Sequence, residues 1–395
     1  MTVRIAAGLL ALSLSLLAAP AATAVAAAAV AAEAPAAAPA TTAELIESLG
    51  LHTAPTPVRE RPGWRPPRVI LVDHIEPDLL PRLRQAAPAA RLVEIAAATP
   101  ADLAAADATI GVCSEAVLKA ATHLQWIQWP AAGVERCVAQ PLLRERAPLV
   151  TNLQRTFGPS IAEHVLALMM ALSRHLEDFY LQQRQGHWQP WQEAPQLQDL
   201  EGRTLLVAGL GGIGTEVARR AHALGMRVVA TRASGHEGPE FVSYVGLPNE
   251  LVKLAHEADF VVNCLPLTPE TTGLFDKAFF AAMKPTAYFV SVGRGRSTVT
   301  ADLVAALNAG TIAGAGLDVL DPEPVPRDSA AGGLARGAVP PDDPLWRTPH
   351  LLITPHVAAK TAAAEAAGNA VLVENLRRYV AGERMLSVVD ITKGY

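Results

Sequence analysis

The sequence is short of cysteine and of concentrated positive charge. Its three cysteines, Cys113, Cys137 and Cys264, are scattered along the chain and odd in number. This usage predicts buried thiols, not a disulfide framework, and the sequence predicts no metal site. The formal net charge is −5 and the basic residues form no cluster, which argues against a nucleic-acid partner.

Long hydrophobic runs are missing as well. The apolar stretch Ile5–Leu17 is too short and too rich in alanine for a membrane span, so no stable membrane insertion is expected. It follows Arg4 and precedes Ala22-Thr23-Ala24, the pattern of a secretory signal peptide over residues 1–24. No twin arginine is present, and no cysteine follows the stretch to carry a lipid. The pattern predicts an exported, periplasmic protein; the alternative is a start codon placed too far upstream, which leaves the protein cytoplasmic.

The remainder of the chain predicts alternating strands and helices. The 395 residues, of which 50% are hydrophobic, suffice for two ordinary domains. Residues 25–65 are expected to form an Ala- and Pro-rich linker. Beyond it, apolar strand patterns occur at Val69–Val72, Val93–Ala96, Ala108–Val112, Leu124–Gln128 and Leu149–Thr151. Strands that alternate with helices predict a parallel sheet covered on both faces.

A glycine-rich turn stands at the centre of the second half. The strand pattern Leu205–Ala208 runs into Gly209, Gly211 and Gly214, and a helical pattern follows. In this spacing the first glycine permits a tight turn, the second lets a pyrophosphate approach, and the third allows close helix–strand packing. The helix N-terminus favours the phosphates. The predicted dinucleotide loop comprises Gly209, Leu210, Gly211, Gly212, Ile213 and Gly214.

The end of the next strand, Arg227–Thr231, bears on the choice of cofactor. In this fold an acidic residue about 20 positions after the glycines binds the ribose hydroxyls of NAD. Here the residue is Arg232, whose guanidinium can pair with a 2′-phosphate, and Thr231 and Ser234 can add hydroxyl groups. The sequence therefore predicts NADP over NAD. The alternative is that Arg232 points to solvent and NAD binds through its pyrophosphate.

Three residues that can do chemistry are expected at strand ends, where open α/β sheets bind ligands: Arg294, Glu323 and His356. Reduction of a carbonyl needs a proton donor, and histidine is the side chain best matched to neutral pH. A carboxylate on the far ring nitrogen orients the imidazole and favours its protonated form. The carboxylate of a 2-oxo acid requires a forked cation such as arginine. Each residue alone has an ordinary structural explanation, but together they predict 2-oxo-acid reduction.

From about residue 66 to 390 the chain resembles the NAD(P)-dependent D-isomer-specific 2-hydroxyacid dehydrogenases. The motifs that carry the resemblance are Gly209-Leu-Gly-Gly-Ile-Gly, Leu265-Pro-Leu-Thr-Pro-Glu-Thr, Gly293-Arg-Gly, Asp318-Val-Leu-Asp-Pro-Glu and Thr354-Pro-His. The resemblance implies that Arg294 binds the substrate carboxylate and keto oxygen, that His356 is the acid/base, and that Glu323 is its partner. Further residues that it implies at the cofactor are Leu265, Pro266 and Asp318.

The stretch after Trp126 resembles the substrate loop of the family. Backbone N–H groups of Ala131, Ala132 and Gly133 would hold the substrate carboxylate; the alternative is a plain strand-to-helix turn. Three features depart from the family pattern. Glu135 stands where an aspartate is common after Gly-Val, a minor change. Trp129 places a large ring beside the loop, and an insertion around Ala330–Val339 lengthens the segment before the catalytic histidine.

The predicted fold is two doubly wound parallel-sheet domains, a flavodoxin-like substrate domain and an inserted Rossmann nucleotide-binding domain. The first comprises residues 66–155 and 350–395, and the second residues 156–349. The expected function is reduction of a small 2-oxo acid such as glyoxylate or hydroxypyruvate by NAD(P)H in a homodimer. The alternatives are a nucleotide-sensing binding protein with vestigial activity and a formate- or phosphite-type dehydrogenase.

Overall fold

A computed structural model describes residues 41–73, 75–323 and 339–394. Two parallel sheets organise these residues, and each sheet has a hydrophobic core on both faces. The predicted signal peptide, residues 1–24, and residues 330–338 of the predicted insertion lie outside the described part. Within the described residues, no helix combines the length and apolar character that a membrane crossing requires.

The first sheet has five parallel strands in the order β2-β1-β3-β4-β5, the flavodoxin-like order. Its strands are β1 (Val69–Val72), β2 (Arg91–Glu94), β3 (Ala108–Ile110), β4 (Trp126–Gln128) and β5 (Leu149–Thr151). The segments between them contain α2 (Leu79–Ala86), η2 (Ile95–Ala97), α3 (Pro100–Ala105), α4 (Glu115–Ala120), α5 (Glu135–Val138) and α6 (Pro141–Arg146). Every residue of β1, β3 and β4 is buried, since helices cover both faces, and this explains their apolar runs.

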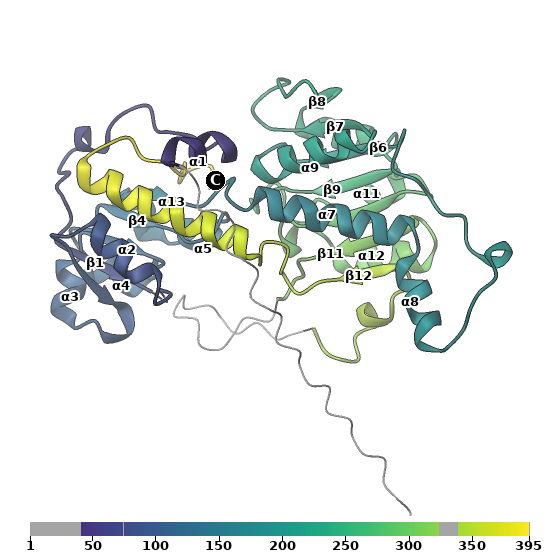
Figure 1. The fold of residues 1–395 in the computed structure, drawn as a ribbon, viewed down its shortest axis with the longest axis horizontal. Helices are drawn as coiled ribbons and strands as arrows, with labels where there is room; N and C mark the ends of the chain where they lie inside the picture. Colours follow the sequence, from purple (N-terminus) through teal and green to yellow (C-terminus); the bar gives the residue numbers. More distant parts are fainter. Residues whose placement is uncertain (1–40, 74, 324–338, 395) are drawn as a thin grey trace, which may run out of the picture. The chain divides into compact units, whose positions relative to one another are not determined.

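The carboxyl-terminal helix α13 (Ala362–Ala381) covers one face of this first sheet, as Figure 1 shows. The ring of Tyr379 stacks on Trp126 of β4, with ring centroids 4.7 Å apart. One turn away, the Asn375 side chain donates a hydrogen bond to Gln128 at 2.9 Å. The helix begins at Thr361, whose hydroxyl accepts the N–H of Ala364, and ends at a left-handed glycine.

The second sheet has seven parallel strands in the order β12-β11-β10-β9-β6-β7-β8, a Rossmann order with one added strand. Its strands are β6 (Thr204–Ala208), β7 (Arg227–Thr231), β8 (Tyr244–Gly246), β9 (Phe260–Asn263), β10 (Tyr288–Ser291), β11 (Gly314–Leu317) and β12 (Leu351–Ile353). Helices α7 (Gly158–Ser173) and α9 (Gly212–Ala223) pack on one face, and α10 (Leu251–Ala255), α11 (Lys277–Ala282) and α12 (Thr300–Asn308) on the other. The fold class predicted from the sequence is therefore confirmed.

Shorter elements complete this part of the chain. After α7 the chain turns into α8 (Leu176–Arg184), which carries exposed Leu176, Tyr180 and Leu181. The remaining 3-10 turns are η3 (Trp191–Glu193), η4 (Pro248–Glu250), η5 (Gly295–Ser297) and η6 (Pro344–Arg347).

Two predicted boundaries differ from the structure. The linker expected over residues 25–65 is already folded from residue 41, where α1 (Thr42–Leu49) begins, followed by η1 (Val58–Glu60). Leu45 packs with Leu153 and Val371, so this segment belongs to the core. The sequence did not reveal it because its few apolar residues stand in a region rich in alanine and proline. At the other end, β12 pairs with β11 and belongs to the seven-stranded sheet, although residues from 350 onward were assigned to the first domain.

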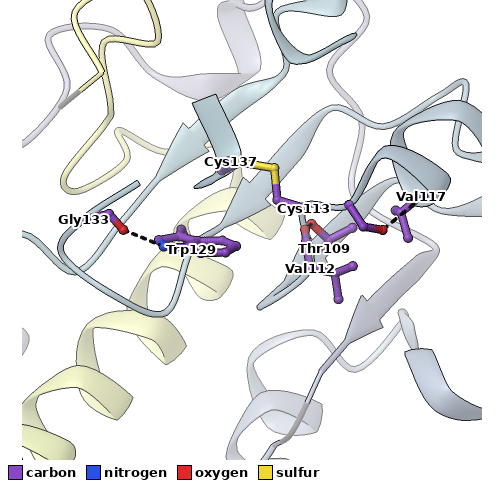
Figure 2. The surroundings of a disulfide bond; sticks show 8 residues. Thr109, Val112, Cys113, Val117, Trp129, Gly133 and Cys137 are labelled. Carbon is purple, nitrogen blue, oxygen red and sulfur yellow. Dashed lines mark hydrogen bonds between the residues drawn. A yellow bond between two sulfur atoms is a disulfide. The ribbon is translucent and has the colours of Figure 1, made fainter. Parts of the chain in front are cut away.

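The prediction of three buried thiols is wrong for Cys113 and Cys137, which form a disulfide (Figure 2). Cys113 follows β3, and Cys137 lies in α5, which follows β4. Because β3 and β4 are adjacent parallel strands, the segments after their carboxyl ends lie close together, and the two Cα atoms are 5.4 Å apart. Sequence spacing does not reveal this adjacency, which depends on strand order. Cys264 keeps a free thiol, and burial raises its pKa to about 12.

Candidate active site

The glycine-rich loop joins β6 to the N-terminus of α9. Gly209 has a φ of 96°, in the left-handed region that favours glycine, and its N–H donates to the carbonyl of Thr231 on β7. A Cβ on Gly214 would overlap the carbonyl oxygen of Gly209, so only glycine allows this close packing. Among the described residues, no atom beyond its chain neighbours lies within 4 Å of the Cβ position of Gly211. The loop therefore leaves room for a pyrophosphate at the N-terminus of a 12-residue helix.

Arg155 also reaches this loop, and the sequence analysis missed it. It lies just before α7 with a φ of 70°, uncommon for a residue other than glycine, and its Cα is 2.8 Å from the Cβ position of Gly212. Burial and the nearby charge of Arg232 both lower its pKa. No described residue accepts a hydrogen bond from its guanidinium. Two arginines thus share the neighbourhood of the dinucleotide loop, a pairing that no sequence motif indicates.

The residues predicted to read the ribose lie beyond β7. Thr231 is buried, and its carbonyl accepts the N–H of Leu210. Arg232 is partly exposed, and its Nη1 donates to the carbonyl of Glu237 at 2.9 Å, which holds the guanidinium over its own turn. Ser234 is exposed on the same turn. The described structure therefore places Arg232 and Ser234 together, near Arg155.

Leu265 and Pro266 lie on the other side of the glycine loop. A Leu265 methyl group is 3.0 Å from the Cβ position of Gly209. The Leu265 carbonyl oxygen is 2.7 Å from the Cβ position of Gly293. Pro266 is exposed. Ile213 packs from α9 onto the core of the domain. This segment therefore connects the dinucleotide loop to the turn that carries Arg294.

His356 and Glu323 form a direct hydrogen-bonded pair. The imidazole Nδ1 lies 2.9 Å from Glu323 Oε2, and the His356 side chain is 50% exposed. The hydrogen bond to Glu323 raises the pKa of His356 and outweighs burial, which lowers it. Burial would raise the pKa of Glu323, but the hydrogen bond and charge of His356 bring it below the ordinary value. Each partner of the pair therefore favours the charged form of the other.

Asp318 holds the backbone around His356. This buried carboxylate accepts the N–H groups of Val357 and Ala358, at 2.9 and 3.1 Å, and the hydroxyl of Thr354 at 2.6 Å. The His356 N–H donates to the Asp318 carbonyl at 2.8 Å. These contacts keep His356 at a φ of 54°, which a histidine seldom adopts. Asp318, expected at the cofactor, thus holds the histidine segment, and its Oδ1 atom also lies 3.6 Å from His164 Nε2 on α7.

Arg294 follows β10 and bridges to the substrate loop of the first domain. Its Nε donates to Glu135 Oε1 at 2.6 Å, and its Nη1 to the Gly293 carbonyl at 2.8 Å. Its Nη2 lies so close to Gly133 that any side chain there would overlap it. The charge of Arg294 lowers the pKa values of both His356 and Glu323. The structure therefore brings together the three residues predicted to be catalytic and adds Glu135, whose role the sequence did not indicate.

The substrate loop is held from several sides. The indole N–H of Trp129 donates to the Gly133 carbonyl at 2.7 Å, so the ring closes the loop on itself (Figure 2). Asn152 donates to the Ala132 carbonyl at 2.6 Å, and the Leu153 N–H donates to that of Ala131 at 3.1 Å. The disulfide ties down α5, directly after the loop. With three carbonyls engaged by the protein, the loop N–H groups are the ones available to an anion.

A glycine loop that accepts a dinucleotide, a histidine–carboxylate pair and an arginine on a second α/β domain define a nicotinamide-dependent dehydrogenase. The model for the D-isomer specific 2-hydroxyacid dehydrogenase NAD binding domain matches residues 166–358. A family protein from Aeromonas salmonicida subsp. salmonicida A449 is 30% identical, with a TM-score of 0.67 and coverage of 82% of this chain and 99% of that chain. This chain belongs to the D-isomer-specific 2-hydroxyacid dehydrogenase family and is an NAD(P)-dependent enzyme.

Two further solved structures are similar to this chain. A D-isomer specific 2-hydroxyacid dehydrogenase from Xanthobacter autotrophicus Py2, in complex with NADPH and MES, is 26% identical with a TM-score of 0.69, and the match covers 84% of this chain and 100% of that one. An NADPH-dependent glyoxylate/hydroxypyruvate reductase from Sinorhizobium meliloti, in complex with NADP and sulfate, is 25% identical with a TM-score of 0.68, and the match covers 83% and 100%.

Proposed function

We propose that the enzyme reduces a small 2-oxo acid, such as glyoxylate or hydroxypyruvate, to the D-2-hydroxy acid. The observation that carries the proposal is the arrangement of Arg294 against Gly133 together with the His356–Glu323 pair. An arginine and loop N–H groups fit a carboxylate, and a protonated imidazole fits the adjacent keto oxygen. The relative from Sinorhizobium meliloti, named for glyoxylate and hydroxypyruvate, supports this substrate class.

The chemistry divides between the cofactor and the residues of the chain. A nicotinamide cofactor, when bound at the glycine loop, supplies the hydride that reduces the carbonyl carbon. Glu323 holds Nδ1 of His356, which leaves Nε2 to deliver its proton to the keto oxygen. Glu135 holds the Nε edge of Arg294 and leaves its Nη2 edge for the substrate. Asp318 positions the backbone that carries His356.

A turnover assay with glyoxylate, hydroxypyruvate, pyruvate, formate and phosphite tests the proposal. We expect the 2-oxo acids to be reduced with oxidation of NAD(P)H. We expect no reduction of NAD(P)+ by formate or phosphite. Oxidation of formate to carbon dioxide needs no proton donor, so the His356–Glu323 pair would have no part in it. Turnover of formate or phosphite alone, or of no substrate while cofactor binds, would identify one of the alternative functions instead.

The pH dependence of the reduction should report on the paired histidine. Because the pKa of His356 is raised above 6.5, reduction should proceed fully at low pH and decline only as pH rises through that higher value. Oxidation of the hydroxy acid needs the neutral imidazole, so its kcat/KM should rise as pH rises through the pKa of His356. In Glu323→Gln the limb of reduction should move to lower pH, since the main cause of the raised pKa is gone. Profiles of kcat/KM for both enzymes measure this; an unmoved limb assigns it to another group.

We propose NADPH as the preferred cofactor, on the basis of Arg232 and the nearby Arg155. Loss of one charge-assisted contact to the 2′-phosphate costs about 1.5–3 kcal/mol, so Arg232→Ala should lower kcat/KM for NADPH roughly 10- to 150-fold and leave NADH unchanged. Arg232→Asp should favour NADH. Arg227→Ala, at the exposed opposite end of the same strand, is the matched control. An equal or higher kcat/KM for NADH in the unmodified enzyme would remove Arg232 from the site.

We propose that the protein is exported. The support is the Ile5–Leu17 stretch before Ala22-Thr23-Ala24 and the Cys113–Cys137 disulfide, since disulfides persist in oxidising compartments. The mature chain should begin near Val25 outside the cytoplasm, with one free thiol before reduction and three after it. Amino-terminal sequencing and thiol titration of fractionated cells measure both. A cytoplasmic chain that keeps Met1 or begins near Thr41 would contradict export.

We further propose a homodimer, supported by exposed apolar side chains on and after α8. They are Leu176, Tyr180, Leu181, Trp188 and Trp191. Exposed apolar side chains on a surface favour association. Light scattering after size-exclusion chromatography should give twice the mass of the chain, and the mass of one chain would contradict the dimer.

A further inference from the structure

A cluster of four possible metal ligands lies at the amino-end edge of the seven-stranded sheet. His175 precedes α8, Glu177 and Asp178 lie in its first turn, and His350 immediately precedes β12. The His350 carbonyl accepts the N–H of Ala315, which fixes this residue to β11. The catalytic residues follow the carboxyl ends of the strands, so this cluster occupies the opposite edge and takes no part in the site described above.

The geometry of the cluster is close to that of a coordination sphere. One nitrogen or oxygen atom from each of the four residues lies within 4.8 Å of the others. The Nδ1 atoms of His175 and His350 lie 3.0 and 3.9 Å from the same oxygen, Asp178 Oδ2. Tetrahedral zinc with bonds of about 2.1 Å separates its ligands by roughly 3.4 Å. Small side-chain rotations therefore suffice to bring all four atoms onto one cation.

Glu177 provides an independent indication that a ligand belongs here. Its Oε2 atom is buried and has no hydrogen-bond partner among the described residues. A buried oxygen without a partner destabilises the fold, and a cation at the cluster would remove that cost.

We propose that His175, Glu177, Asp178 and His350 bind a divalent cation of the zinc class. Two imidazoles and two carboxylates are ligands that zinc accepts, whereas magnesium and calcium prefer oxygen alone. Four protein ligands complete a tetrahedral sphere, so the site is structural. The cation links the first turn of α8 to the start of β12, segments far apart in the sequence. It thereby fixes the helix that carries the exposed Leu176, Tyr180 and Leu181.

Calorimetric titration of the untagged full chain with zinc sulfate, after removal of metals by EDTA and dialysis, tests the site. We expect one equivalent of tight binding. His175→Ala and His350→Ala should each weaken it at least about 100-fold, because loss of a direct ligand exceeds the usual effect of removing an outer partner. His256→Ala, which removes an exposed imidazole after α10, is the matched control and should bind as the unmodified protein does.

Glu177→Gln keeps the shape of the side chain and decides the question if the histidine variants do not fold. It should weaken zinc binding at least about 10-fold and reduce the zinc-dependent rise in Tm. The kcat of this variant should match the unmodified enzyme, which shows that its fold and active site are intact. Zinc binding of equal strength in all variants, or no saturable binding to the unmodified chain, overturns the proposal. Neither result bears on the 2-oxo-acid reductase function.

Discussion

His356→Ala is expected to lower kcat for 2-oxo-acid reduction by roughly two to four orders of magnitude, the usual range for losing a positioned general acid. The hydrogen bond to Glu323 engages Nδ1 of His356 and raises its pKa, and no other described histidine contacts Glu323. Binding of NADPH should survive, because the glycine loop and its neighbouring arginines remain. Steady-state kinetics and fluorescence titration of the cofactor measure the two properties separately.

His256→Ala is the control for loss of an imidazole as such, since His256 is exposed beyond α10. A second check is Glu323→Gln, which should reduce kcat less than His356→Ala while it moves the pH profile. Near-full turnover by His356→Ala would show that another group delivers the proton and that the proposed mechanism is wrong.

Arg294→Ala should lower kcat/KM for the 2-oxo acid by roughly 150- to 25,000-fold. Two charge-assisted hydrogen bonds to the substrate contribute about 1.5–3 kcal/mol each, and every 1.36 kcal/mol is a factor of ten. The loss should appear in both KM and kcat, since Arg294 also lies beside the keto oxygen in the proposed pose. Arg294→Lys should recover only part of it, because an ammonium group cannot bond Glu135 and the substrate as a fork.

Arg296→Ala is the matched control, since Arg296 lies two residues further along the same turn and is exposed. Glu135→Gln adds a second comparison. It keeps a hydrogen-bond acceptor for Arg294 but removes the charge, and should weaken substrate binding less than Arg294→Ala does. If Arg294→Ala and Arg296→Ala have the same modest effect, Arg294 does not bind the substrate carboxylate.

Much of this fold was predictable because it depends on local patterns. The glycines at 209, 211 and 214 stand between a strand pattern and a helix pattern, and that order admits few structures. Arg294, Glu323 and His356 each follow a strand, and parallel strands bring their carboxyl ends to one edge. The alternation of strands and helices predicted two parallel sheets for the same reason.

The features that escaped prediction depend on contacts between distant segments. Cys113 and Cys137 meet only because β3 and β4 are neighbours. Arg155 reaches the dinucleotide loop because the start of α7 packs against Gly212. Its positive φ could not be predicted, because arginine is not a residue type that favours this backbone conformation. Glu135 was noted as a small departure from a family pattern, whereas its importance lies in the 2.6 Å bond to Arg294.

The helix α13 has a consequence for the order in which the chain can fold. Its Leu372, Leu376 and Tyr379 complete a core begun by Ile70 and Trp126, near the start of the described chain. As the chain is synthesised, the five-stranded sheet must therefore wait for the last helix, while the elements from α7 to β12 are contiguous and can assemble first. Until α13 arrives, the apolar face that it shares with α2 stays partly uncovered and open to association with other chains. A polypeptide that crosses a membrane amino end first would meet this delay on the far side, where chaperones that shield apolar surface would be needed most.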